Sequence, residues 1–260
     1  AGEGVRELIL VAQDPTAYGE DWGRPGAICE LLDRLQEIDG IRWIRILYAY
    51  PERISDEFIA AMVRNTKVVP YLDLPIQHCD DAVLKAMNRR GGRKEIEDAI
   101  ARLRAAIPGI TLRTTLIAGF PGETEEQYAE LCDFVKTVRF DRLGCFAYSA
   151  EENTVAAKMP NQIDEETKQR RADHIMELQA EVSAEREGEK VGHTYECICD
   201  GVDDETGMYL LRTKADCPEI DGNVLTPADT PLETGAFYKV TITDSDTYDL
   251  YGYAEERLED

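Results

Sequence analysis

Five apolar runs separated by segments of helical spacing occupy the first 150 residues, and this alternation limits the fold more than any other feature of the chain. The runs cover residues 5–12, 41–50, 68–74, 110–118 and 143–148. Runs of this length and composition are typical of buried parallel strands. Helical spacing of apolar positions is found in residues 28–38, 54–63, 80–87, 94–107 and 125–138. Strands that alternate with helices predict right-handed crossovers and one parallel sheet, open or closed.

Five strands are too few for a complete eight-stranded barrel. If the parent fold is a six-stranded partial barrel, its first strand and helix are missing, and the chain begins where a second unit would start. The opening residues Ala1 to Gly4 then look like a cut end. We therefore expect an α/β fold in the form of a partial (β/α) barrel that lacks its first unit.

The last hundred residues follow another pattern. Residues 164–187 are strongly charged but place Ile175, Leu178 and Val182 at helical spacing, which predicts a long helix on the outside of the barrel that ends at Gly188. Short β-type runs then follow at residues 193–198, 208–212, 223–225, 237–243 and 250–253. This spacing predicts a small five-stranded antiparallel β-barrel. We divide the chain into domains of residues 1–187 and 188–260.

Negative charge is concentrated in the smaller domain. The chain has a net charge of -23, and residues 188–260 contain 18 Asp or Glu against 5 Lys or Arg, a net charge of -13. Such a domain repels phosphate groups, which argues against direct nucleic-acid binding. A basic protein is the better electrostatic partner.

The apolar runs, the N-terminus and the cysteines limit the class of protein to which the chain can belong. No apolar run approaches the roughly 20 residues of a membrane span, and the N-terminus shows no export signal. The seven cysteines form an odd number without a disulfide framework, so we interpret them as reduced, mostly core-packed thiols of a cytoplasmic protein. Cys197 and Cys199 lie on one face of a predicted strand, which alone is weak evidence for a metal.

Polar side chains follow the predicted strands. They are Gln13 with Asp14, Tyr48 with Tyr50, Gln77 with His78, Arg113 with Thr115 and Gly119, and Tyr148 with Ser149. Because the carboxyl ends of parallel strands meet at one edge, we expect them to line a single barrel mouth that suits a nucleoside with a ribose and an amino-acid tail. The alternative is that each residue merely closes its strand.

A glycine turn, residues 119–122, directly precedes a predicted helix start. Thr124 and Gln127 fit a capping box, so Thr124 is interpreted as a helix cap. Free N–H groups at this turn could bind a carboxylate or phosphate, and a simple tight turn is the competing interpretation. The sequence has no HxxxH motif for zinc, no phosphate-binding loop and no Gly-x-Ser-x-Gly elbow.

Several motifs together resemble the radical S-adenosylmethionine methylthiotransferases. The matching stretches are Gln13–Gly19, Tyr50–Pro51, Leu74–His78, Met87–Arg89, Gly119–Thr124 and Phe146–Ser149. The resemblance implies a radical SAM barrel that binds S-adenosylmethionine against a [4Fe-4S] cluster, an auxiliary [4Fe-4S] cluster in a preceding domain, and a C-terminal TRAM domain that engages the substrate. By resemblance, the cofactor-binding residues are Gln13, Gln77, Arg89, Arg113, Gly119, Gly122 and Tyr148.

The family has two branches, of which one modifies a tRNA adenosine and the other an aspartate of a small-subunit ribosomal protein. Residues 141–144, 148–154, 215–222 and 248–252 are similar to the ribosomal branch, and the acidic C-terminal domain suits that basic substrate. The implied reaction adds a methylthio group to the aspartate β-carbon, with the difficult radical step supplied by the cofactor.

One departure from the family pattern is large, because none of the seven cysteines matches the cluster motif CxxxCxxC. The resemblance therefore implies a chain truncated at its N-terminus, with the ligands of both clusters outside it, and no activity of this chain alone. Three alternatives stay open: the tRNA branch, a non-catalytic adaptor that binds a basic protein, and a barrel lyase or aldolase that uses Lys67 or Lys85.

Overall fold

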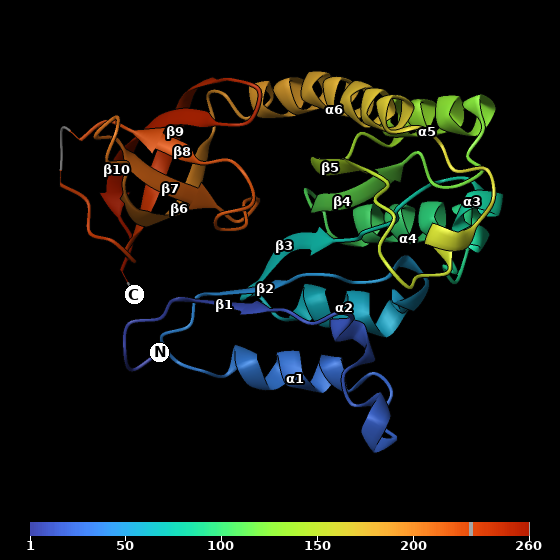
Figure 1. The fold of residues 1–260 in the computed structure, drawn as a ribbon. Coiled ribbons are helices and arrows are strands. Elements are labelled where there is room, and N and C mark those ends of the chain that lie inside the picture. Colours follow the sequence, from blue (N-terminus) through green and yellow to red (C-terminus); the bar gives the residue numbers. More distant parts are fainter. Residues whose placement is uncertain (229–230, 260) are drawn as a thin grey trace.

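The computed structural model describes residues 1–228 and 231–259. Its first part is one parallel sheet whose strands lie side by side in chain order, as predicted (Figure 1). The strands are β1 (Glu7–Leu10), β2 (Trp43–Ile46), β3 (Val68–Asp73), β4 (Thr111–Ala118) and β5 (Arg142–Ala147). The sheet stays open at β1 and β5, so the domain is a partial (β/α) barrel.

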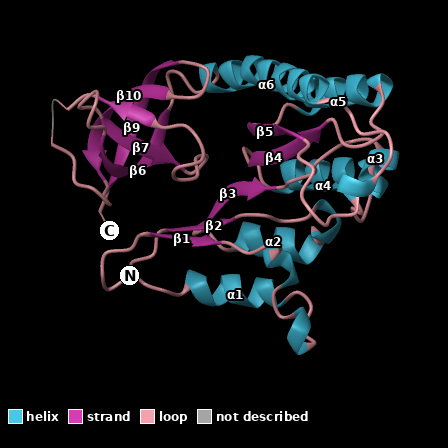
Figure 2. Ribbon diagram, in the orientation of Figure 1, coloured by secondary structure: helices cyan, strands magenta, loops and turns pink. Residues whose placement is uncertain are grey.

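The helices cover one face of this sheet and leave the other face to the lumen of the partial barrel (Figure 2). They are α1 (Ala27–Gln36), α2 (Asp56–Arg64), α3 (Asp81–Ala86), α4 (Arg93–Ala106) and α5 (Glu125–Val138). Leu32, Phe58 and Leu103 from three helices meet Ile46 and Leu72 of the sheet in the main core. Burial of these apolar faces is the main source of stability for such a layer.

Local sequence explains where the helices begin. The Thr124 hydroxyl accepts from the Gln127 N–H at 3.3 Å, and the Gln127 Oε1 accepts from the Thr124 N–H at 2.9 Å, which confirms the predicted capping box of α5. Ser55 and Asp80 cap α2 and α3 by a single hydrogen bond each, since their side chains accept from the N–H groups of Phe58 and Val83. These caps satisfy backbone donors that a helix start leaves without partners.

The helix α6 (Glu165–Gly188) confirms the long charged helix. Ile175 and Leu178 reach the main core, and Val182 is also buried. Figure 1 shows α6 running along β5 toward the second domain. Since α6 ends at Gly188 and the next strand begins at Thr194, we keep the boundary at residues 187 and 188 as a proposal.

The second domain is a closed five-stranded barrel. Its strands are β6 (Thr194–Val202), β7 (Tyr209–Thr213), β8 (Val224–Thr226), β9 (Phe237–Ser245) and β10 (Leu250–Arg257), in the order β10-β8-β7-β6-β9. Four pairs are antiparallel as predicted, but β8 and β10 are parallel, with Val224 opposite Leu250. A closed ring of five strands cannot alternate in direction throughout, so one parallel pair is required.

The small barrel packs against the amino ends of the strands of the partial barrel. Trp43 of β2 and Phe237 of β9 meet edge to face with ring centroids 4.9 Å apart. Tyr71 of β3 packs in the same cluster with Ile198 and Cys217 of the small barrel. The lumen therefore has a floor made by the second domain and a mouth at the carboxyl ends of the strands. Among the described residues, no helix is long and apolar enough to cross a membrane.

Candidate functional site

A cavity of about 750 Å³ opens at the mouth of the partial barrel. Its walls come from the carboxyl ends of β1 to β4 and the loops that follow them. Polar or aromatic lining residues are Gln13, Tyr48, Tyr50, Gln77, Arg89 and Thr115. Three of the seven predicted cofactor residues, Gln13, Gln77 and Arg89, are thus brought together. Tyr48, Tyr50 and Thr115 also line the cavity, as their strand-end positions predicted, although they were not among the seven predicted cofactor residues.

Two of these residues have strained backbones. Gln77 has φ of 69° and Tyr48 has φ of 65°, in the left-handed region that side-chain-bearing residues seldom adopt. Hydrogen bonds of 2.9 Å from the Gln77 N–H to the Thr115 carbonyl, and from the Ile117 N–H to the Gln77 carbonyl, hold this backbone against β4. The buried Gln77 Oε1 has no partner among the described residues. Strain and an unpaired acceptor are both typical of ligand sites.

Arg89 gives the mouth a fixed positive charge. Its guanidinium lies over the Tyr50 ring at 4.5 Å and donates to the Pro75 carbonyl at 2.8 Å. The stack holds the side chain in place, since a guanidinium over an aromatic face is attracted to the ring. A guanidinium held in this way can bind a carboxylate through its other donors.

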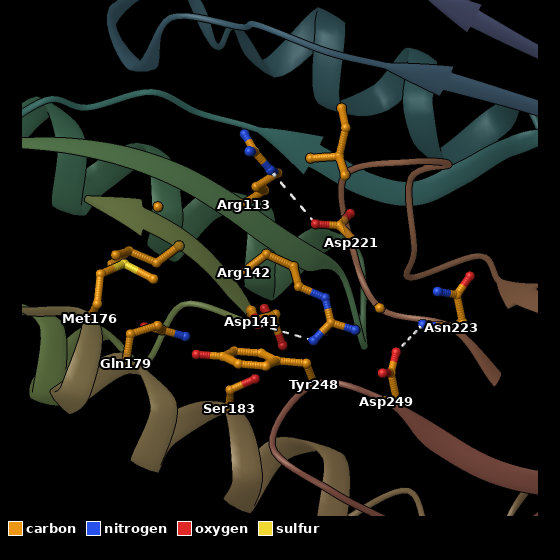
Figure 3. Close-up of a pocket in the computed structure, with 14 residues that line it drawn as sticks. Arg113, Asp141, Arg142, Met176, Gln179, Ser183, Asp221, Asn223, Tyr248 and Asp249 are labelled. Atoms are coloured by element: carbon orange, nitrogen blue, oxygen red, sulfur yellow. Dashed lines mark hydrogen bonds and ion pairs between the residues drawn. The ribbon is translucent and has the colours of Figure 1, made fainter. Parts of the chain in front are cut away.

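Arg113 lies far down β4, on the floor side, rather than at the mouth. Its guanidinium is 3.2 Å from Asp73 Oδ1 and 3.7 Å from Asp221 Oδ1 of the second domain (Figure 3). Burial by itself would lower the pKa of Arg113, and the charges of Asp73 and Asp221 outweigh it and raise that pKa. The structure therefore does not bring Arg113 together with the mouth residues, and its cofactor role stays a prediction.

The glycine turn is occupied by internal contacts. Gly119 has φ of +77°, and a Cβ there would lie 2.5 Å from Lys168 Cγ. Its N–H donates to Glu123 Oε2 at 2.9 Å, while the Gly122 N–H donates to the Asn161 carbonyl at 3.0 Å. These contacts favour the tight-turn interpretation, and neither glycine lines the mouth cavity. Ligand binding by the turn stays a prediction.

Two other strand-end residues are covered. His78, which we expected at the mouth, is fully buried: its Nδ1 accepts from the Asp80 N–H at 2.9 Å, and its Nε2 is 3.5 Å from Glu123 Oε2. Tyr148 is 8% exposed and packs edge to face on Phe120 at 5.2 Å. The prediction that His78 lies at the mouth is therefore wrong. The hydrogen bond from the Asp80 N–H, at the start of α3, holds the His78 ring in the protein interior.

The cysteines do not fit an iron–sulfur cluster. All seven are free, and burial is the largest cause of raised thiol pKa values, with Cys79 and Cys145 each at about 12. Within the described ranges, no three His, Cys, Asp or Glu side chains are grouped closely enough to hold a metal ion. Cluster ligands must be thiolates that converge on one point, and the cysteines of the described residues do not meet this requirement.

Comparisons with known proteins agree with this architecture. The model of the radical SAM superfamily matches residues 1–135, and that of the TRAM domain matches residues 191–254. The solved coproporphyrinogen III oxidase HemN from Escherichia coli, a radical SAM enzyme, is 20% identical with a TM-score of 0.56 and covers 69% of this chain and 41% of its own. The chain belongs to the radical SAM superfamily.

Within that superfamily the chain is of the RimO type. The ribosomal protein uS12 methylthiotransferase RimO of Desulfitobacterium hafniense is 47% identical over 97% of this chain and 56% of the relative. The protein of the same description from Clostridioides difficile is 45% identical, with 97% and 56% covered. The chain therefore spans little more than half the length of the curated relatives that it matches.

Proposed function

We propose that the mouth cavity binds S-adenosylmethionine. The observation that carries this proposal is the convergence of Gln13, Gln77 and Arg89 on one cavity, with a buried Gln77 oxygen that lacks a partner. Its volume of about 750 Å³ lies in the range of roughly 300–1,000 Å³ that is usual for small-molecule sites. Donors, acceptors and an aromatic wall suit a nucleoside with an amino-acid tail.

Each residue can be given a part in holding the ligand. Arg89 would bind the carboxylate of the amino-acid tail. Gln77 Oε1 would accept from the ammonium group or a ribose hydroxyl, which removes the cost of its unpaired burial. The Tyr48 ring, 40% exposed, would cover the nucleoside. When bound, S-adenosylmethionine supplies the radical chemistry by which an unactivated C–H bond can be replaced.

The reaction that we propose is methylthio transfer to the β-carbon of an aspartate in ribosomal protein uS12. Support comes from relatives of 45–47% identity that are described as uS12 methylthiotransferases. The two [4Fe-4S] clusters would take their ligands from outside these 260 residues, because the cysteines present do not fit them. The chain alone would then bind cofactor and substrate without turning over. Seven free thiols favour a cytoplasmic location.

The acidic second domain is the proposed contact for the basic substrate protein. Some of its carboxylates already form ion pairs with the first domain. These pairs are Glu196 with Arg42, Asp216 with Arg142, and Asp221 with Arg113. The remaining exposed carboxylates still attract a basic partner and repel phosphates. This balance favours the ribosomal substrate over tRNA.

The test has two stages. Equilibrium dialysis of the chain with S-adenosylmethionine should show one site, and purified uS12 should bind with an affinity that salt weakens. In the whole protein with reconstituted clusters under anaerobic conditions, we expect 5'-deoxyadenosine and a methylthio mass gain on uS12. Turnover on tRNA instead of uS12 would overturn the substrate assignment, and cofactor binding without any turnover would support an adaptor.

A further inference from the structure

A second cavity, of about 460 Å³, lies at the seam between the two domains. Figure 3 shows that its walls come from β5 and the residue before it, from α6, and from two loops of the small barrel. It is separate from the mouth cavity, and the two share no lining residue. Its lining includes Asp141, Arg142, Gln179, Asp221, Tyr248 and Asp249.

Carboxylates outweigh cations around this seam cavity. Asp141 Oδ2 accepts from the Leu112 N–H at 2.9 Å and Asp249 Oδ1 accepts from the Asn223 N–H at 2.7 Å, so backbone donors hold both carboxylates in place. Arg142 lies 2.5 Å from both Glu187 Oε1 and Asp216 Oδ1. Lys190 Nζ also lies 2.9 Å from Glu187 Oε2, so these two carboxylates face two cations, and the Arg142 Nε has no partner among the described residues.

Arg113 is the other lining cation, and two carboxylates, Asp73 and Asp221, face it. Asp141 and Asp249 add two more carboxylates, of which Asp141 lies 3.8 Å from Arg186. Among these side chains six carboxylates therefore face four cations, which are Arg113, Arg142, Arg186 and Lys190. An anionic ligand would be repelled from such walls, and a cationic one would be attracted.

Two further features indicate the shape of a cationic ligand. Gln179 is 1% exposed; its Nε2 donates to the Phe140 carbonyl at 2.9 Å, and its buried Oε1 has no partner among the described residues. Figure 3 shows this side chain rising from α6 into the space beside Arg142 and Tyr248. Tyr248 exposes 47% of its surface. An unpaired acceptor beside an open aromatic ring suits a group with several N–H donors and a positive charge.

We propose that the seam cavity receives an arginine or lysine side chain of the basic partner protein. Identification of that partner as uS12 rests on the proposed function, whereas the cation preference rests on the cavity alone. The cavity joins β5, α6 and the small barrel, so a side chain held there would touch both domains at once. It would thereby place the partner along the open edge of the partial barrel.

The first experiment tests the cation preference with a defined probe. Backbone amide NMR shifts of the chain are followed during titration with the peptide Gly-Gly-Arg-Gly-Gly, and with its citrulline version as the matched uncharged control. We expect saturable shifts at Gly144, Gly222 and Asn223, with an affinity at least tenfold weaker for citrulline. Equal affinities, or shifts that avoid the seam, would overturn the proposal.

The second experiment tests whether uS12 uses the cavity. Tyr248→Leu combined with Asp249→Asn removes the aromatic face and one charge, and the asparagine oxygen can still accept from Asn223. The control combines Tyr253→Leu with Asp244→Asn, since Tyr253 is 50% exposed on β10, whereas Tyr248 lies in the turn before that strand. We expect at least tenfold weaker uS12 binding for the seam variant and less than twofold for the control.

The outcomes separate the two proposals. If uS12 binds the wild type and the seam variant equally, the seam inference fails while the proposed function stands. If the arginine peptide shifts the seam but uS12 does not bind, the cation site stands and the partner assignment fails. If neither probe binds the wild type, both the seam inference and the assignment of uS12 as partner fail.

Discussion

The mouth and the floor of the partial barrel use polar side chains in opposite ways. At the mouth, Gln77 keeps an unpaired buried oxygen and, like Tyr48, a strained backbone. At the floor, Arg142 and Arg113 each meet two carboxylates across or beside the domain seam. Polar groups without protein partners are available to a ligand, whereas the paired ones hold the two domains together.

The difference also explains why a strongly charged residue is poor evidence for a site. Arg89 and Arg113 were both predicted to bind cofactor, yet only Arg89 lies in the mouth cavity. Buried ion pairs cost desolvation and add little net stability, but removal of one partner is severe. We interpret the floor pairs as a device that fixes the orientation of the small barrel, which the following predictions test.

The largest effect is expected at the floor. Arg142→Met leaves Glu187 and Asp216 buried without their guanidinium, and should lower the free energy of unfolding by about 3–5 kcal/mol. Urea denaturation of the wild type and the variant measures this loss of unfolding free energy. The control is Arg34→Met, whose exposed pair with Glu30 should be worth less than about 1 kcal/mol. Comparable losses in the two variants would remove the distinction between seam and surface pairs.

The next prediction concerns the glycine turn. Gly119→Ala combines left-handed strain with contact against Lys168, and we expect a loss of about 3 kcal/mol in unfolding free energy. Gly122→Ala is the matched control, because its φ is +86° but nothing lies within 4 Å of the added Cβ. It should cost only about 1–2 kcal/mol. Equal costs would show that the space beside Lys168 is not limiting.

A smaller effect is expected at the mouth, on binding rather than stability. Arg89→Met and Gln77→Leu should each weaken S-adenosylmethionine binding about tenfold, or about 1.4 kcal/mol, with little change in unfolding. Arg113→Met is the floor counterpart and should leave the dissociation constant unchanged. If Arg113→Met weakens binding as much as Arg89→Met does, the separation of mouth and floor is wrong.

The smallest effect is a change of stability with pH at the floor. Burial alone would raise the pKa of Asp216, but Arg142, Lys190 and a hydrogen bond from Thr213 lower it below its usual 3.8. A pKa lowered by folding contributes stability above pH 3.8 that is lost as pH falls through the folded pKa. The stability difference between wild type and Asp216→Asn should therefore shrink below pH 3.8. A constant difference from pH 6 to pH 2.5 would contradict this.

Prediction from sequence succeeded where the signal was periodic and local. Each predicted strand and helix is present, and the Thr124 capping box formed because its two partners are three residues apart. The parallel pairing of β8 and β10 was missed, although an odd number of strands in a closed barrel already required one parallel pair. The predicted barrel was entirely antiparallel, which a closed barrel with an odd number of strands cannot be.

Candidate site residues were predicted less completely. Gln13, Gln77 and Arg89 reached the same cavity because each follows a strand of one parallel sheet. His78 also follows a strand, but its hydrogen bond from the Asp80 N–H turns it into the core. A strand-end position therefore selects the correct edge of the sheet without deciding which side chains face the opening.

By itself, the sequence determined the order of strands and helices, the second barrel and the acidic character of that barrel, because periodicity and composition are local properties. Only the tertiary structure decided which charged side chains form ion pairs within the molecule. Asp216 lies 74 residues from Arg142 along the chain, and their contact depends on how two domains pack. No local spacing encodes such a distance, so the seam, its ion pairs and its cavity became visible only in three dimensions.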